Sequence, residues 1–218
     1  VEEEGLSLDV VSDGELYTAL EAGFPPERIH FHGNNKTPDE LEMALDANIG
    51  CFVVDNFVEL RMLNAIAAQK GKNVNILLRL TPGVEAHTHE FISTGQIDSK
   101  FGFDLESGAA FEAVKEAASL SQVHVLGVHS HIGSQIFEVE GFRLAVEKVS
   151  EFAADVKNRL NFDFEVLNLG GGFGIRYTKE DTPLPVSAYV QAITGTVKEQ
   201  FAARSMPIPQ IWVEPGRS

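Results

Sequence analysis

Short apolar runs alternate along this chain with longer segments in which apolar residues recur every three or four positions. The short runs predict buried strands, and the longer segments predict helices with one apolar face. Because each helix joins one strand to the next, the alternation predicts a parallel sheet with crossover helices. Strands are expected at 8–11, 29–32, 51–54, 75–80, 123–130, 164–169 and 211–213, and helices at 13–22, from 38 onward, 57–69, 109–120, 139–160 and 185–203.

Capping residues support several of these helix boundaries. Thr37 stands directly before Pro38, which is the order expected for a helix cap followed by the first helical residue. Ser12 or Asp13 is suited to cap the first helix, and Gly71 to close the third. Residues 84–104 show no clear period, and so long a loop within a compact domain is usually functional.

Seven strands of this kind are one short of an eight-stranded βα barrel. An open doubly wound sheet is the competing architecture, but its glycine-rich turn follows the first strand with G-x-G-x-x-G spacing. Here the glycine-rich run follows the sixth strand and lacks that spacing. The sequence therefore favours an α/β barrel, one domain over 1–218, without its first strand. Since the chain begins without Met and stops just after a strand end, we expect it to be truncated at both ends.

The composition is that of a globular protein, with 44% hydrophobic and 22% charged residues. The formal net charge of −15 argues against nucleic acid or an anionic membrane as a partner. No apolar run approaches the roughly 20 residues of a membrane span, and no signal-peptide pattern opens the chain. The single cysteine, Cys51, lies in an apolar run, so we expect a buried thiol and a cytoplasmic protein.

Three strand ends carry glycine, hydroxyl and charged residues. They are the segments His129–Gln135, Asn168–Gly174 and Glu214–Arg217. In a barrel the carboxyl ends of all strands meet at one face, so we expect these loops to surround one ligand. The glycines at 170–172 and 174 favour a turn whose backbone N–H groups bind a phosphate. A tight strand-to-helix turn is the simpler alternative.

Several single residues have two interpretations. His131 and Ser134 lie where a ligand is expected, whereas His129 is interpreted as a buried core histidine. Glu214 could stabilise a protonated ring nitrogen and Arg217 could bind a phosphate or carboxylate, or the two could form a surface ion pair. Arg79 has the same two interpretations.

Histidine pairs leave a metal site open as a second hypothesis. Six of the seven histidines form His-x-His pairs, a common spacing of metal ligands: His30/His32, His87/His89 and His129/His131. A zinc- or iron-dependent hydrolase on a barrel is therefore an alternative. The glycine-rich turns have no explanation in that hypothesis.

The motifs HSHIGSQ, NLGGGFGIRY and EPGRS together resemble the alanine-racemase-like pyridoxal-phosphate decarboxylases, and within them the diaminopimelate decarboxylase family. The stretches DVVS, HFHGNNK and SKFGF add to this resemblance, which covers essentially the whole chain. It implies a (β/α)₈ barrel followed by a β-domain that is absent here, a homodimer, and pyridoxal 5′-phosphate as cofactor. The residues that the resemblance assigns are His131 to stacking on the cofactor ring, Ser134, Gly171, Gly172, Gly216 and Arg217 to the phosphate, Glu214 to the pyridine nitrogen, and Arg79 and Arg217 to the substrate.

The sequence departs from this family in two places. The family's Schiff-base lysine lies on the first barrel strand in a Y/F-A-x-K-A context, which does not occur here, and Lys36 matches a different family position. The C-terminal motif whose Cys and Glu act across the dimer is absent as well. We therefore expect the seven strands to be the family's second to eighth, and the chain alone to have little activity.

The activity implied by the resemblance is decarboxylation of meso-2,6-diaminopimelate to L-lysine. A related ornithine or arginine decarboxylase, a racemase and a non-catalytic pyridoxal-phosphate-binding protein are the alternatives within the same cofactor class. The phosphate turn by itself does not select among these substrates.

Overall fold

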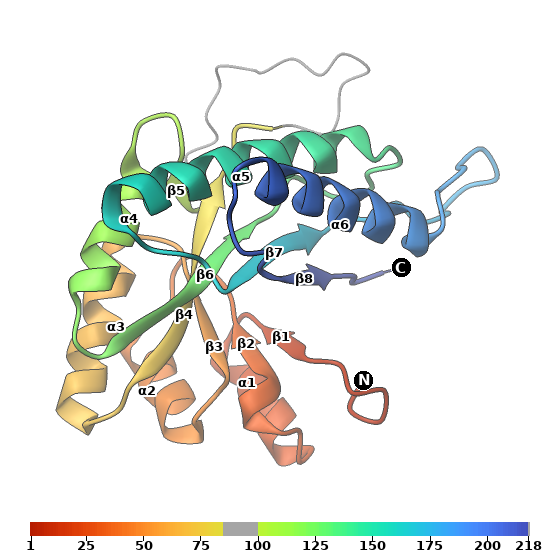
Figure 1. Cartoon of the computed structure of the whole chain (residues 1–218). Helices are drawn as coiled ribbons and strands as arrows, with labels where there is room; N and C mark the ends of the chain where they lie inside the picture. The colour runs from red at the N-terminus through yellow and green to blue at the C-terminus, as the bar shows by residue number, and fades with distance from the viewer. Residues whose placement is uncertain (85–99, 218) are drawn as a thin grey trace.

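One parallel sheet runs through the molecule, and helices pack along its outer face (Figure 1). The computed structural model describes residues 1–84 and 100–217. The strands are β1 (Leu8–Val10), β2 (Ile29–Phe31), β3 (Cys51–Val54), β4 (Val74–Thr81), β5 (Phe103–Asp104), β6 (Val123–Ser130), β7 (Val166–Gly171) and β8 (Gln210–Glu214). The helices are α1 (Asp13–Glu21), α2 (Pro38–Ala47), α3 (Phe57–Lys70), α4 (Ala109–Ser119), α5 (Glu140–Leu160) and α6 (Val186–Ala203), with a short 3₁₀ helix at Pro26–Arg28.

The strand order confirms barrel-type winding. The sheet runs β1-β2-β3-β4-β6-β7-β8, and every neighbouring pair is parallel. The order follows the sequence without the reversal that defines a doubly wound sheet, so that alternative is wrong. Within the described ranges β1 and β8 each have one strand neighbour, which leaves the sheet open between them.

All seven predicted strands are present, with ends shifted by at most two residues. The sequence missed β5, which contains two residues and pairs with β4 beside Leu80 and Thr81. A strand this short is below the length at which alternation can be recognised. Much of the predicted loop at 84–104 lies outside the described residues.

The helix starts follow the predicted capping chemistry. The Thr37 hydroxyl accepts a hydrogen bond from the Glu40 N–H, and the Glu40 carboxylate accepts one from the Thr37 N–H. This reciprocal pair satisfies two N–H groups that a helix start leaves free. Ser12 caps α1 in a similar way, by accepting from the Glu15 N–H.

The central strands of the sheet, such as β3 and β7, are buried on both faces. On β3, Phe52 and Val54 belong to the large core beneath the helices, whereas Cys51 and Val53 belong to a smaller cluster that includes Trp212 of β8. Such two-sided burial is typical of parallel strands and explains their continuous apolar runs. Burial also raises the pKa of the Cys51 thiol to about 12, so this thiol stays protonated, as expected for a core cysteine.

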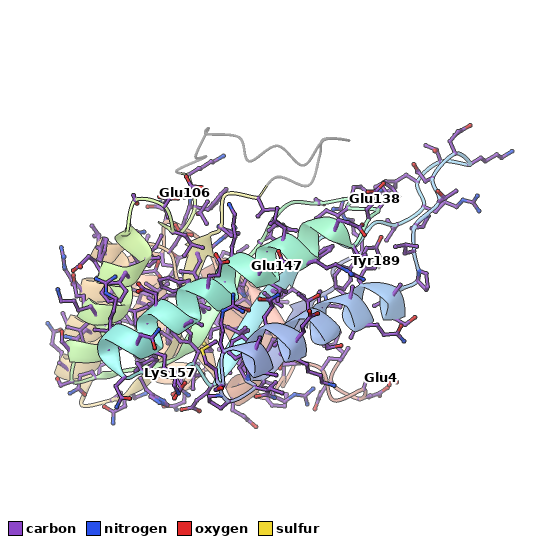
Figure 2. All side chains as sticks on the ribbon, turned by 45° about the horizontal axis from the view of Figure 1, so that its top comes forward. Glu4, Glu106, Glu138, Glu147, Lys157 and Tyr189 are labelled. Atoms are coloured by element: carbon purple, nitrogen blue, oxygen red, sulfur yellow. The ribbon has the colours of Figure 1, made fainter. Side chains whose placement is uncertain are left out.

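Helices α5 and α6 lie side by side over the half of the sheet that carries the glycine-rich turn (Figures 1 and 2). Tyr189 of α6 stacks on Phe173, which follows that turn, with ring centroids 4.9 Å apart. Its hydroxyl donates a hydrogen bond to the Ile136 carbonyl oxygen at 2.8 Å. Tyr189 thus anchors the loops after β6 and β7 to the helix layer. Among the described residues no helix has both the length and the apolar composition needed to cross a bilayer.

A buried ion pair fixes the loop after β2. Lys36 Nζ lies 2.7 Å from Glu59 Oε1 and donates two more hydrogen bonds, to the carbonyl oxygens of Gly33 and Val53. The second carboxylate oxygen of Glu59 accepts from the Asp55 N–H at 3.0 Å. Burial lowers the pKa of Lys36 and raises that of Glu59, while the charge and hydrogen bond of each partner oppose these shifts.

We expect Glu59→Gln to lower the free energy of unfolding of the full-length protein by about 2 kcal/mol, the usual size of a hydrogen bond to a buried charge. Urea denaturation measures this change. The matched control is Glu112→Gln, which alters an exposed pair with Lys115 and should cost less than about 1 kcal/mol. Equal effects of the two substitutions would show that the Lys36 contact contributes nothing beyond a surface pair.

Candidate functional site

Three loops predicted to surround one ligand do lie together at the carboxyl ends of β6, β7 and β8. The Arg217 guanidinium donates a hydrogen bond to the Ser134 hydroxyl and another, at 2.7 Å, to the Tyr177 hydroxyl. Gly172 is in contact with the backbone of the Ser134 loop, because a Cβ added to it would overlap the Gly133 carbonyl oxygen. Ser134, Gly172 and Arg217 therefore form one small surface of hydroxyl, backbone and guanidinium groups.

The glycine-rich turn needs glycine for steric reasons. Gly170 and Gly172 have positive φ angles of 68° and 86°, which other residues rarely adopt. A Cβ on Gly171 would overlap the Glu214 carbonyl oxygen on β8. Gly216 has open space around it, with no atom within 4 Å of an added Cβ. The turn is thus held tightly against its neighbours, while the side at Gly216 remains open to a ligand.

Glu214 lies beside this turn in a polar cluster drawn from several strands. Its carboxylate accepts a hydrogen bond from Asn168 Nδ2 at 2.7 Å. His129 Nε2 lies 3.2 Å from one carboxylate oxygen and 3.3 Å from the other, and His32 Nε2 lies 3.3 Å from the first. Among the described residues Glu214 has no ion pair with Arg217, so the predicted alternative of a surface Glu–Arg pair is wrong.

These contacts keep Glu214 charged. Burial raises the pKa of its carboxyl group, but the charge and hydrogen bond of His129, followed by the charge of His32, outweigh burial and bring the pKa to about 2. His129 itself is fully buried, and burial lowers its pKa. A neutral imidazole still donates one N–H. The site therefore presents a fixed carboxylate at neutral pH.

Sequence reasoning missed most of the groups around Glu214. The interpretation of His129 as a core histidine was right about burial and incomplete about its role, because the ring contacts Glu214. His32 was noticed only as half of a histidine pair, and Asn168 had no assigned role. The signal that could have found them is position, since His32 lies just after β2 in the stretch HFHGNNK and Asn168 opens the motif NLGGGFGIRY.

Asp9 and His30 extend the cluster toward the edge strand β1. Asp9 Oδ1 lies 3.5 Å from His30 Nδ1 and 3.6 Å from His32 Nε2. Burial raises the pKa of Asp9, but hydrogen bonds and charges of the two histidines hold it well below its usual range. The His30 ring stacks on Trp212 of β8 at 4.6 Å, so it connects the two open sides of the sheet.

His131 and Arg79 border the same site. His131 lies just beyond β6, over Gly170, where an added Cβ would come within 3.0 Å of its Nδ1. Partial burial and then the charge of His129 lower its pKa, so the ring is uncharged at neutral pH. Arg79 of β4 lies 3.8 Å from Asp55 and covers the Phe101 ring. Burial lowers the pKa of Arg79, and the negative charges of Asp55 and then Glu214 oppose that shift.

Among the described residues the possible metal-ligand set combines histidines from two different His-x-His pairs. His32 and His129 come from different pairs and, with Glu214, offer ligand atoms that all lie within 4.8 Å of one another. This set could hold a metal ion, which the sequence argument had not found. His87 and His89 lie outside the described residues. A hydrogen bond to Glu214 accounts for the position of His129 without an ion, whereas the buried Nε2 atom of His32 has no hydrogen-bond partner among the described residues.

A groove of about 550 Å³ separates β1 from β8. It is lined by Leu8 and Asp9 on one side, by Trp212 and Glu214 on the other, and by His30 between them. Both bordering strands present unpaired backbone to it within the described ranges. The groove thus leads from the open sheet edges directly to the Glu214 cluster.

The structure thus combines a parallel barrel-type sheet, a glycine-rich turn and a half-buried carboxylate at the strand ends. The whole chain, residues 1–218, matches the family described as pyridoxal-dependent decarboxylase, pyridoxal binding domain. The chain therefore belongs to this family, and the barrel fold and the cofactor class predicted from the sequence are confirmed.

Individual relatives are diaminopimelate decarboxylases. The chain is 62% identical to diaminopimelate decarboxylase of Bacillus methanolicus over 217 residues, which is 100% of this chain and 50% of that protein. Diaminopimelate decarboxylase of M. jannaschii superposes with a TM-score of 0.89 at 39% identity, over 99% of this chain and 49% of that one. The Helicobacter pylori enzyme complexed with L-lysine gives 0.83 at 34%, over 97% and 51%. The chain spans about half the length of these relatives.

The residues present fit pyridoxal phosphate. The Ser134 hydroxyl, the Arg217 guanidinium and the backbone of the glycine turn lie together, which is the kind of donor set that a phosphate needs, and Gly216 beside Arg217 has open space around it. Glu214 supplies a permanent negative charge where a protonated ring nitrogen would need one.

Proposed function

We propose that the full-length protein containing this chain decarboxylates meso-2,6-diaminopimelate to L-lysine with pyridoxal 5′-phosphate as cofactor. The observation that carries this proposal is the convergence of Ser134, Gly172 and Arg217 beside the charged Glu214. The substrate follows from the relatives at 62% and 39% identity, which are named diaminopimelate decarboxylases.

Each residue has a definite task in this proposal. Ser134, Arg217 and the backbone of Gly171, Gly172 and Gly216 bind the cofactor phosphate. His131 stacks its uncharged ring on the cofactor ring. These contacts fix the cofactor plane relative to the sheet, and Arg79 and Arg217 contribute positive charge for the substrate carboxylates.

Glu214 controls the charge of the cofactor ring. Bound pyridoxal phosphate supplies an electron sink for the pair of electrons that remains when CO₂ leaves the substrate. A carboxylate facing the pyridine nitrogen favours its protonated form, which strengthens that sink. Glu214 keeps this proton on the ring nitrogen. His129 and His32 are buried beside Glu214, so they shield its carboxylate from water.

The groove between β1 and β8 is the proposed place of one more barrel strand, which lies outside residues 1–218. Two unpaired parallel edges facing one another require a strand between them for the barrel to close. A strand there would reach the Asp9 and Glu214 side chains that line the groove. We propose that it carries the Schiff-base lysine, and that residues 1–218 alone have little or no activity.

Two further features of the full-length protein belong to the proposal. A homodimer is proposed from the family resemblance, with an amino acid as the small-molecule substrate. A cytoplasmic location is proposed because the chain's one cysteine is free and buried, as in proteins of reducing compartments.

The decisive experiment is a decarboxylation assay of the full-length protein with diaminopimelate, ornithine, arginine and lysine, each followed by CO₂ release. The proposal expects turnover with diaminopimelate and L-lysine as product. Turnover confined to another amino acid, racemisation without CO₂ release, or cofactor binding without any turnover would each replace it with the corresponding alternative. Stoichiometric zinc or iron in the active protein would favour the hydrolase.

We expect Arg217→Ala to weaken binding of pyridoxal phosphate to the full-length apoprotein by about 10- to 100-fold, because charge-assisted hydrogen bonds to the phosphate are lost. Absorbance titration with the cofactor measures this. Arg61→Ala serves as control, since Arg61 pairs with Glu116 on the helix layer. An unchanged dissociation constant in Arg217→Ala would remove this residue from the phosphate site.

A further inference from the structure

Strand β7 contains a bulge where the glycine-rich turn begins. Asn168 pairs with Trp212 and Gly171 pairs with Glu214. The first two residues are three positions apart and their partners are two positions apart, so β7 has one residue more than β8 over this stretch. Bulges of this kind take a backbone N–H out of the strand ladder and bend the strand. They are frequent beside active sites.

The Asn168 side chain provides a hydrogen-bond partner for a backbone N–H group in the bulge. Its Oδ1 accepts a hydrogen bond from the Gly170 N–H at 2.9 Å, while its Nδ2 donates to Glu214 Oε1 at 2.7 Å. The residue is 2% exposed, so water does not compete for either contact. With the amide reversed, oxygen would face a carboxylate and nitrogen would face an N–H, so the neighbours permit one orientation.

The bulge lies between His131 and Glu214, the two residues that the proposed function assigns to the cofactor ring. On one side Gly170 lies beneath His131, within 3.0 Å of Nδ1 for an added Cβ, and on the other Gly171 presses against the Glu214 backbone. A change in the shape of the bulge would therefore move His131 and Glu214 relative to one another. Asn168 is the side chain that contacts both the bulge and the Glu214 carboxylate.

We infer that Asn168 is a positioning residue that joins the phosphate turn and the ring-nitrogen carboxylate into one rigid unit. This inference rests on the proposed function for the tasks of the phosphate turn and of Glu214. The contacts by which Asn168 joins them are a property of the chain itself. An aspartate at this position would keep the acceptor for Gly170 and place a second carboxylate 2.7 Å from Glu214. Asparagine is thus the residue that serves both contacts at once.

Asn168→Asp tests the coupling in the full-length apoprotein, because two carboxylates at this distance must share a proton. The thermal unfolding midpoint at pH 7 should fall relative to wild type, and the difference should shrink as the pH is lowered toward 5. The double variant Asn168→Asp/Glu214→Gln should recover much of the loss, since the glutamine amide can donate to the new carboxylate. The other titratable groups facing Glu214 are His129 on β6, His32 just after β2, Asp9 on β1, Arg79 on β4 and His131 beyond β6.

Ligand titrations distinguish an effect on the phosphate turn from an effect on the position of Glu214 relative to it. In Asn168→Asp the affinity for inorganic phosphate should stay within about threefold of wild type, whereas the affinity for pyridoxal phosphate should fall at least tenfold. Asn75→Asp is the matched control, an exposed asparagine on β4 at the opposite end of the sheet, and it should change neither affinity.

Additive effects of the two substitutions on the unfolding midpoint would overturn the inference, as would an Asn168→Asp protein indistinguishable from Asn75→Asp. If Asn168→Asp does not fold, the double variant decides: a folded double variant supports the coupling, and an unfolded one refutes it. The unfolding midpoints are measured without substrate, so they test the role of Asn168 even if the protein does not decarboxylate diaminopimelate.

Discussion

Glu214→Gln in the full-length protein is expected to lower kcat by about 100- to 1,000-fold, the usual cost of removing a preorganised electrostatic group. The substitution removes the charge that favours a protonated ring nitrogen. Shape and most hydrogen bonds are kept, because the free Nδ1 of His129 lets this ring exchange tautomers and accept from the new amide. Steady-state kinetics should show the loss in kcat, with a smaller change in KM.

The matched control is Glu165→Gln, an exposed glutamate at the other end of β7 that contacts His124. It should leave both kinetic constants unchanged. A kcat in Glu214→Gln within a few-fold of wild type would show that ring charge does not depend on this carboxylate, and it would remove the electrostatic basis of the proposed function.

The pH dependence of the unfolding free energy provides a second test of the charge on Glu214. The pKa of Glu214 is lowered from the ordinary 4.5 to about 2, so its ionised form stabilises the folded state above pH 4.5. That stabilisation is lost as the pH falls through about 2. Glu214→Gln lacks this component, so its unfolding free energy should decline less steeply below pH 4.5 than that of wild type.

Gly172→Ala is expected to lower the free energy of unfolding by about 4 kcal/mol, the combined cost of a left-handed alanine and of overpacking. Gly172 has a φ of 86°, and the added Cβ would overlap the Gly133 carbonyl oxygen. Because the obstacle is backbone and not a flexible side chain, either the glycine turn or the Ser134 loop must move. Cofactor affinity should fall with stability.

Gly195→Ala provides the control for this substitution. Gly195 lies exposed within α6, with a φ in the ordinary range and no atom within 4 Å of an added Cβ. Alanine there should stabilise the protein by up to about 1 kcal/mol, because it has the higher helix propensity. Urea denaturation of both variants decides the point, and a Gly172→Ala protein as stable as wild type would contradict the tight packing of the two loops.

The elements of this fold could be predicted because their signals are local. Capping at Thr37, the apolar run at Cys51–Val54 and the glycine at position 71 each act within a few residues. Strand β5 could not be predicted, because its two residues become a strand only by pairing with Leu80 and Thr81. Pairing of this kind depends on the neighbouring strand and not on the segment itself.

The candidate site divides in the same way. Ser134, Gly172 and Arg217 stand in motifs whose residue types already indicate a phosphate, and the structure brings them together. His32 and Asn168 carry no such signal. Their role comes from reaching Glu214 across strands that are far apart in the sequence.

By itself the sequence determined the order of strands and helices, the glycines that only a tight turn requires, and the family, because residue type and spacing encode these directly. Only the tertiary structure decided which polar side chains surround Glu214, that Arg217 contacts Ser134 instead of Glu214, and that the sheet is open between β1 and β8. The physical reason is that hydrogen bonds and charges act over a few ångströms in space. Which strand ends come that close is set by the winding of the whole sheet.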